Sequence, residues 1–219
     1  MTAHQLTVSK TARYYLLGKP GPHIKQVWFV CHGYGQLAEY FVRKFQALDN
    51  GETRVVAPEG LSHFYLEGTS GRVGATWMTR VDRLAEIADY TQYLNTLAGY
   101  VLPQLPEQVK VYVLGFSQGA ATVCRWLASG RVSCRALVLW AGVFPPDLNA
   151  EAAFAALQKT RVLLAAGTTD AYLTEQAANQ QLQQLQKLGL HAELHWFNGG
   201  HEINTALLME LDRKLSAEN

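Results

Sequence analysis

Residues 115–119, Gly-Phe-Ser-Gln-Gly, form a pattern in which a serine can act as a nucleophile. The pattern follows the apolar, β-branched run 109–115 and precedes a helical sequence that ends near Gly130. A nucleophile on a tight strand-to-helix turn requires small residues two positions to either side, because larger side chains would collide with the neighbouring backbone. Glycine occupies both positions, so the sequence predicts that Ser117 is a catalytic nucleophile rather than an ordinary turn serine.

Two polar residues that could activate this serine follow later apolar runs. A serine hydroxyl is a weak nucleophile and passes its proton to a base, which is usually a histidine held by a carboxylate. Asp170 comes shortly after the run 161–167, and His201 comes shortly after the run 190–197. The chain order is serine, aspartate, histidine, with each residue just beyond a different expected strand. We therefore predict that Ser117, Asp170 and His201 form a catalytic triad.

Each partner of Ser117 has a competing interpretation. Asp170 could instead cap the helix expected from about Leu173, and Glu175 is a poorer acid because it lies inside that helix. His32 is the other histidine that follows an expected strand within a glycine-containing loop, and we interpret it as a support for that loop. With His201 as the base, activity should fall in acid, because a protonated imidazole cannot accept the serine proton.

The transition state of acyl transfer also needs two hydrogen-bond donors for the oxygen that becomes negatively charged. One expected donor is the backbone N–H of Gln118, which follows the nucleophile at the start of a helix. The other is the backbone N–H of Tyr34, in the loop His-Gly-Tyr-Gly at 32–35. Because both donors are backbone groups, substitution of either side chain should reduce activity less than substitution of Ser117.

Apolar runs that alternate with helical patterns provide the framework for these residues. Parallel strands connected by helices are covered on both faces, and their reactive groups gather at the carboxyl ends of the strands. We expect an α/β fold with a mostly parallel sheet, and the loosely alternating stretch 6–17 is expected to add an antiparallel hairpin at one edge. The expected strands are 27–31, 54–57, 109–115, 135–142, 161–167 and 190–197. The expected helices are 37–48, 82–97 with Asp82 as its cap, 118–130, a short alanine-rich helix before 161, 173–188 and one after Glu202.

The connection 61–80 is unusually long and mixes aromatic residues with glycines. Loops of this length are usually functional or disordered, and this composition suits an apolar wall beside the site. We predict that the segment forms a partial lid, and the alternative is an ordinary surface loop. The side chains expected to line the substrate pocket are Phe64, Trp77, Phe144 and Tyr172.

Charge and length exclude several classes of function. Nineteen Lys and Arg residues against eighteen Asp and Glu residues leave a formal charge of +1 over 219 residues, far from the basic excess that nucleic-acid binding needs. No apolar run approaches the ~20 residues that cross a bilayer, and the first ten residues lack the order of a secretory signal. We expect a cytoplasmic protein with one domain, 1–219, without a nucleic-acid partner or integral membrane association.

The sequence also predicts that the protein needs no metal and no cofactor. His191, Glu193 and His195 share one face of an expected strand, but residues in such a row stand about 7 Å apart, too far for one ion. The glycines of 33–35 lack the third glycine of a dinucleotide fingerprint, and residues 18–20 lack the pattern of a P-loop. The three cysteines include no C-x-x-C pair and are expected to be buried, reduced thiols.

Six short motifs occur in the order found in a known family. HGYG, APEG, GFSQGA, AGVFP, GTTD and GGHEI resemble the motifs of the phospholipase/carboxylesterase family, which includes acyl-protein thioesterases, over nearly the whole chain. The resemblance implies a cap-free α/β-hydrolase fold and activity on carboxylic esters, thioesters or lysophospholipids, with Ser117, Asp170 and His201 as the triad and without a cofactor. Two positions differ from the family pattern: Gln36 replaces a common acid, and residues 76–79 (TWMT) replace a Trp-Phe-Asp signature.

Other functions remain open at this point. The same three side chains could serve a peptidase or a lactone hydrolase, and a protein of this fold could also bind a small ligand without turnover. The expected partner is a small-molecule ester or acyl substrate, and a homodimer is compatible with the sequence.

Overall fold

A seven-stranded sheet forms the centre of the computed structural model, which describes residues 1–217; the last two residues of the predicted domain lie outside this range. The strand order is β1-β3-β2-β6-β7-β8-β9. Neighbouring strands are parallel apart from β1 and β3, which are antiparallel. The strands are β1 Tyr14–Leu17, β2 Gln26–Cys31, β3 Thr53–Pro58, β6 Lys110–Phe116, β7 Ala136–Trp140, β8 Arg161–Gly167 and β9 Ala192–Phe197. The expected mostly parallel α/β sheet is therefore confirmed.

The helices occupy the expected places with two local differences. They are α1 Ala38–Phe41, α2 Arg83–Val101, α3 Gln118–Ala128, α4 Ala150–Leu157, α5 Glu175–Lys187 and α6 Thr205–Ala217. The expected helix 37–48 is one α-helical turn that continues as the 3₁₀ helix η1, Val42–Leu48, and α2 continues as the 3₁₀ helix η2, Leu102–Gln104. Asp82 occupies the N-cap position of α2, as expected, but its side chain makes no capping hydrogen bond. Its φ of 49° departs from the extended backbone that is typical of capping residues.

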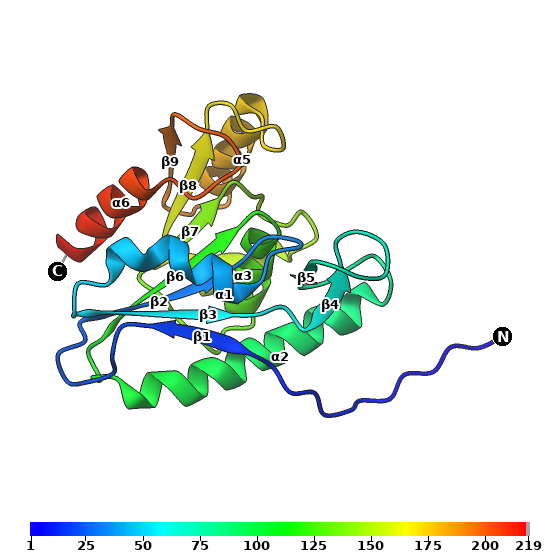
Figure 1. The fold of residues 1–219 in the computed structure, drawn as a ribbon. Helices are drawn as coiled ribbons and strands as arrows, with labels where there is room; N and C mark the ends of the chain where they lie inside the picture. Colours follow the sequence, from blue (N-terminus) through cyan, green and yellow to red (C-terminus); the bar gives the residue numbers. More distant parts are fainter. Residues whose placement is uncertain (218–219) are drawn as a thin grey trace.

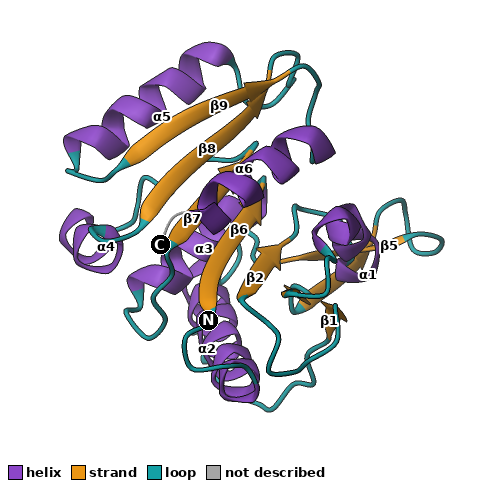
Figure 2. Cartoon of the chain, turned by 90° about the vertical axis from the view of Figure 1, so that its left-hand side faces the viewer, coloured by secondary structure: helices purple, strands orange, loops and turns teal. Residues whose placement is uncertain are grey.

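Helices cover both faces of the sheet (Figure 2), with α1 and α6 on one face and α2, α3 and α5 on the other. Successive residues of β2 show the two cores, because side chains alternate across a strand. Val27 and Phe29 belong to the cluster that includes α2 and α3, whereas Trp28 and Val30 belong to the cluster that includes η1 and α6. This burial on both faces explains why the central strands are continuous apolar runs. None of the helices in residues 1–217 is long and apolar enough to span a membrane.

The N-terminal stretch differs from the predicted hairpin. Only β1 pairs with the sheet, with Tyr14 opposite Pro58 and Leu17 opposite Val55. Residues 1–13 have no regular secondary structure and run away from the sheet in Figure 1. The alternating Leu6 and Val8 are 87% and 74% exposed, and no second strand forms in this stretch.

The connection 61–80 contains a hairpin beside the sheet. Its strands, β4 Ser62–Tyr65 and β5 Val73–Thr76, pair antiparallel, and Figure 1 shows them at one end of the molecule near α2. Gln36 and Ala75 form a further antiparallel bridge, which attaches β5 to the loop after β2. The residues of β5 from Gly74 to Thr76 are buried, whereas residues 65–73 between the strands are exposed.

Candidate active site

Ser117 lies between β6 and α3 in a strained backbone conformation. Its φ of 53° and ψ of −116° are unusual for a residue with a side chain, and its N–H donates to the carbonyl of Trp140 at 2.8 Å. The two flanking glycines are required by close packing. A Cβ on Gly115 would overlap the carbonyl oxygen of Gly119, and a Cβ on Gly119 would overlap that of Cys31. These contacts give the physical reason for the Gly-x-Ser-x-Gly spacing.

Asp170 and His201 lie in the loops after β8 and β9, at the same sheet edge as Ser117, because these strands are parallel. His201 Nδ1 lies 2.8 Å from Asp170 Oδ2. The loops are joined by the hydrogen bond from Thr169 N–H to the carbonyl of Gly199, at 3.0 Å. The two residues that the sequence separates by 31 positions are therefore in direct contact.

The Asp170 carboxylate is fixed by both of its oxygens. While Oδ2 contacts the imidazole, Oδ1 accepts hydrogen bonds from the backbone N–H groups of Tyr172 at 2.7 Å and Leu173 at 3.1 Å, and the side chain is fully buried. Asp170 does not cap α5, because the side chain of Thr174 accepts from Ala177 N–H at that position. Thr174, and not Asp170, is therefore the residue that caps this helix.

The imidazole of His201 lies beside the nucleophile turn. Its ring is 4.9 Å from the ring of Phe116, the residue before Ser117, and 4.7 Å from the ring of Tyr172. Among the described residues, no hydrogen bond joins the Ser117 hydroxyl to the imidazole. Hydrogen bonds of this kind are often long in unliganded enzymes and shorten when substrate binds. The structure thus joins Asp170 to His201 directly and places His201 against the neighbour of Ser117.

The loop after β2 leaves the N–H group of Tyr34 without an acceptor among the described residues. Gly33 N–H donates to Gln36 Oε1 at 2.9 Å, Gly35 N–H donates to Ala75 O at 2.9 Å, and Gln36 N–H donates to Gly33 O at 3.3 Å. Within residues 1–217, Tyr34 N–H has no acceptor. Tyr34 is an exposed residue, so this N–H group has no internal partner to lose and can donate to a bound molecule. Gln36, which departs from the family pattern, thus acts as an acceptor inside the loop.

This loop approaches the nucleophile closely. A Cβ on Gly33 would lie 3.2 Å from Ser117 Cβ and 3.0 Å from the Phe116 ring. The N–H of Gln118, the residue after Ser117, is the first of α3 and has no acceptor among the described residues. Because the first N–H groups of a helix have no partner within the helix, Gln118 and Tyr34 each offer a free donor near the serine.

The side chain of Gln118 has a role that the sequence did not reveal. Its Oε1 accepts from Trp77 N–H at 3.1 Å, and its Nε2 donates to Met78 O at 2.9 Å. The Thr76 hydroxyl lies 3.0 Å from Nε2 and 3.1 Å from Oε1. The end of β5 is therefore bonded to the nucleophile turn through Gln118 and to the 32–35 loop through Ala75. No local pattern could show this, because the partners lie about forty positions apart.

His32 is buried behind the loop and is not placed as a base. Its Nε2 accepts from Gly60 N–H at 2.9 Å, and its Nδ1 lies 2.7 Å from the carbonyl oxygen of Gly33. An acceptor at Nε2 and a donor at Nδ1 define a neutral imidazole with the proton on Nδ1. Burial lowers the pKa of His32 to about 4, because desolvation disfavours the charged form.

The predicted pocket residues are divided between the site mouth and the core. The Tyr172 ring is 82% exposed and contacts His201, and the Phe64 ring lies 5.0 Å from that of Tyr34. Trp77 is 1% exposed, and its Nε1 donates to His32 O at 2.8 Å, so it is buried; it lines the cavity beside α2 and not the mouth of this site. Phe144 is partly buried and packs against the same core.

A cavity of about 960 Å³ lies elsewhere, between residues 5–14 and α2. None of the residues that line it belongs to the triad or to the 32–35 loop. One of its walls is the exposed N-terminal segment, so the cavity is a surface channel beneath that segment and not the site described above.

In the row His191, Glu193 and His195, the central Glu193 is engaged in ion pairs. Glu193 contacts Arg161 Nε and Lys214 Nζ, each at 2.8 Å. Among residues 1–217, no group of three or more His, Cys, Asp or Glu side chains is arranged to hold a metal ion.

Several solved structures share this architecture. Acyl-protein thioesterase 2 from Zea mays superposes with a TM-score of 0.73 at 17% identity, covering 94% of this chain and 99% of that one. Esterase PE8 gives a TM-score of 0.70 at 22% identity, covering 94% and 100%. The Bacillus cereus carboxylesterase gives 0.69 at 14% identity, covering 94% and 93%. At these identities the similarity shows the fold alone, which is the α/β-hydrolase fold.

The sequence itself provides the family assignment. No curated protein matches the chain in sequence. A sequence model described as phospholipase/carboxylesterase matches residues 18–219, which include all three residues of the predicted triad and both predicted backbone donors. The chain therefore belongs to the phospholipase/carboxylesterase family.

Proposed function

We propose that this protein is a serine hydrolase that cleaves carboxylic esters through an acyl-enzyme at Ser117. The observation that supports this most strongly is the Asp170–His201 pair at the sheet edge where Ser117 sits on its strained turn. The unpaired N–H groups of Tyr34 and Gln118 add the donors that acyl transfer needs. Membership of the phospholipase/carboxylesterase family supports the same reaction class.

The proposed reaction has two halves. Ser117 Oγ attacks the ester carbonyl carbon while His201 Nε2 takes the hydroxyl proton, and the N–H groups of Tyr34 and Gln118 stabilise the resulting oxyanion. The ester C–O bond then breaks, and the alcohol leaves with the proton from His201. Water attacks the acyl-enzyme in the same way and releases the acid. Asp170 Oδ2 holds Nδ1–H throughout, which keeps Nε2 free to accept the proton.

The substrate is proposed to carry an apolar acyl or aryl group. Tyr34 and Tyr172 are exposed aromatic side chains next to the site, and Phe64 packs on Tyr34. The connection 61–80 adds the exposed Tyr65, Leu66 and Val73 and would act as the partial lid, while β5 stays attached to the loops below. Thioesters and lysophospholipids are further substrates of this proposal, and the resemblance to acyl-protein thioesterase 2 supports the thioester.

The proposal includes a cytoplasmic location and a small-molecule ester or acyl substrate, with no metal or cofactor. The three cysteines support a reducing location, because all are free and buried. Burial raises the pKa of each thiol, so they are poor nucleophiles.

A second candidate is a ligand-binding protein of the same fold without turnover. It is favoured by one observation: the Ser117 hydroxyl and His201 are not hydrogen-bonded within the described residues. A fluorophosphonate probe separates the two candidates. Covalent labelling mapped to Ser117 is the expected result, and an intact protein without label at Ser117 would favour the binding protein. A panel of esters, thioesters, lactones and peptides then separates the esterase from a peptidase or lactone hydrolase.

A further inference from the structure

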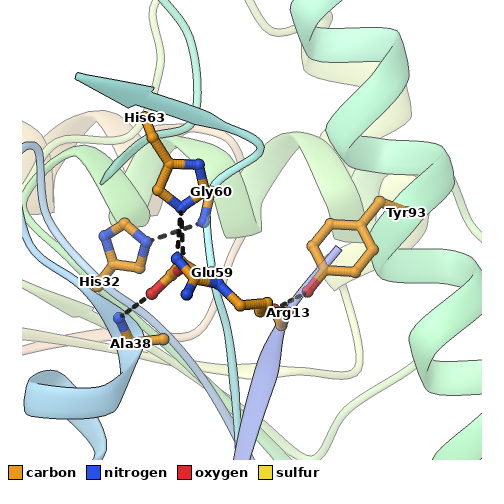
Figure 3. A network of polar contacts seen from close by, with 7 residues as sticks. All are labelled: Arg13, His32, Ala38, Glu59, Gly60, His63 and Tyr93. Carbon is orange, nitrogen blue, oxygen red and sulfur yellow. Dashed lines mark hydrogen bonds and ion pairs between the residues drawn. The ribbon is translucent and has the colours of Figure 1, made fainter. Parts of the chain in front are cut away.

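Glu59 is a buried carboxylate whose two oxygens contact different parts of the chain (Figure 3). It follows β3 directly, and its side chain is 1% exposed. Oε2 accepts from Ala38 N–H at 3.0 Å, while Oε1 lies 2.7 Å from the Arg13 guanidinium and 2.9 Å from His63 Nε2. Burial of an ionised carboxylate is costly unless it is paired and hydrogen-bonded. Glu59 meets both conditions, so its burial depends on these three contacts.

Glu59 and its neighbour Gly60 hold both ends of the loop that carries Tyr34. At the start of the loop, Gly60 N–H donates to His32 Nε2. At its end, the Glu59 carboxylate accepts the first N–H of α1, from Ala38. Figure 3 shows these two contacts side by side. The 32–35 loop is therefore bonded at both of its ends to two consecutive residues, Glu59 and Gly60, which follow β3.

The carboxylate also replaces a missing helix cap. The N-cap position of α1 is Leu37, which makes no side-chain capping hydrogen bond. A negative group at a helix N-terminus is favourable, because the first N–H groups lack partners and carry partial positive charge. Glu59 meets this need from the end of β3, so this carboxylate ties the start of α1 to β3, in addition to the buried Ala38 and Phe41.

Two further side chains, Arg13 and His63, contact the carboxylate from outside the loop. Arg13 precedes β1, and its carbonyl accepts from Glu59 N–H at 3.0 Å and from the Tyr93 hydroxyl at 2.7 Å. His63 lies on β4, in the proposed lid hairpin. Arg13 lies before residue 18, where the family match begins, so this contact comes from a part of the chain outside the matched range.

We propose that Glu59 is a positioning residue for the 32–35 loop, which keeps Tyr34 N–H directed at the oxyanion beside Ser117. This inference rests on the proposed function. Glu59 does not touch the reacting atoms; it acts through Ala38 and the helix that follows the loop. A misdirected donor would weaken transition-state binding without weakening substrate binding, so its loss should reduce kcat and leave KM unchanged.

The experiment measures kcat and KM for p-nitrophenyl butyrate in matched variants with their melting temperatures. Glu59→Ala is expected to lower kcat about 10- to 100-fold with KM within about twofold of wild type. Glu59→Gln should recover most of kcat, because its carbonyl oxygen can still accept from Ala38 N–H. Arg13→Ala removes a 57% exposed side chain and should lower kcat about threefold at unchanged KM. Lys25→Ala removes another exposed ion pair, with Glu52, and should leave both constants unchanged.

The outcomes separate this inference from the proposed function. Wild-type kcat in a folded Glu59→Ala protein, a lower melting temperature alone, or a rise in KM alone would overturn the positioning role. Should Glu59→Ala fail to fold, Arg13→Ala decides, and a kcat equal to that of Lys25→Ala overturns the inference. Ser117→Ala is measured in parallel. Its inactivity together with a fully active Glu59→Ala would reject only the inference, whereas an active Ser117→Ala would reject the proposed function.

Discussion

His201 Nδ1 lies 2.8 Å from Asp170 Oδ2, and the other oxygen of Asp170 is held by two backbone N–H groups. The carboxylate therefore cannot rotate freely, and its charge favours a proton on Nδ1. That tautomer leaves Nε2 as the acceptor for the Ser117 proton. The first prediction follows from this contact.

Asp170→Asn should lower kcat for a p-nitrophenyl ester about 10³- to 10⁴-fold. The amide oxygen can still accept from Tyr172 and Leu173, but the amide nitrogen would face Nδ1 as a donor and favour the wrong tautomer. The melting temperature should change little. Asp89→Asn is the matched control, because Asp89 is exposed on α2. Equal kcat values in the two variants would exclude Asp170 from the triad.

Gly33→Ala should reduce kcat without unfolding the protein. The new Cβ would crowd Ser117 Cβ and the Phe116 ring, at 3.2 and 3.0 Å, and would displace the loop from the nucleophile. Gly99→Ala on α2 is the control, because a Cβ there meets nothing within 4 Å. It should add about 0.5–1 kcal/mol to the free energy of unfolding and leave kcat unchanged. Steady-state kinetics measures kcat, and urea unfolding measures the free energy of unfolding, in each variant. Equal kcat values in Gly33→Ala and Gly99→Ala would show that displacement of the 32–35 loop does not affect catalysis.

Gln118→Ala should lower both kcat and stability, although the backbone donor remains. Removal of the side chain leaves Trp77 N–H without its acceptor, and an unpaired buried group costs about 1–3 kcal/mol. Met78 O keeps the Thr76 hydroxyl as a donor. Urea unfolding measures this loss. Gln92→Ala is the control, on the exposed face of α2. If Gln118→Ala is as stable as Gln92→Ala, the contact between β5 and the nucleophile turn contributes nothing to stability.

His32 should make the protein less stable in acid. Burial lowers its pKa from 6.5 to about 4, so the unfolded chain binds a proton in this range that the folded chain does not. The stabilisation is complete above pH 6.5 and is lost as the pH falls towards 4, by roughly 3 kcal/mol. Urea unfolding from pH 7.5 to 4.5 measures the effect. His32→Gln, whose amide oxygen can accept from Gly60 N–H, should show a smaller decrease, and an identical decrease would assign it to other groups.

The sheet and the order of the site residues could be predicted because both depend on local patterns. Strands such as β2 and β7 are buried on both faces, so they appear in the sequence as continuous apolar runs. Ser117, Asp170 and His201 each follow such a run, and parallel pairing brings the ends of these strands to one edge of the sheet. The same logic failed for 6–17, where alternation alone could not show that Leu6 and Val8 are exposed.

The supports of the site could not be predicted, because they join residues that are far apart in the chain. Gln118 bonds the end of β5, Glu59 bonds Ala38 and Arg13, and Trp77 enters the core against His32. Each contact is decided by packing between elements, and composition gives no signal for it. Trp77 shows the difficulty, since its position among glycines predicted a wall of the substrate pocket, whereas the structure buries it at the cavity beside α2.

The most direct test of the account is the rate of p-nitrophenyl ester hydrolysis by Ser117→Ala, with folding checked by circular dichroism and melting temperature. The removed hydroxyl is the proposed nucleophile, so kcat should fall by about 10⁴-fold or more in a protein that melts as wild type does. A folded Ser117→Ala protein that retains wild-type turnover would contradict the assignment of Ser117 as the nucleophile.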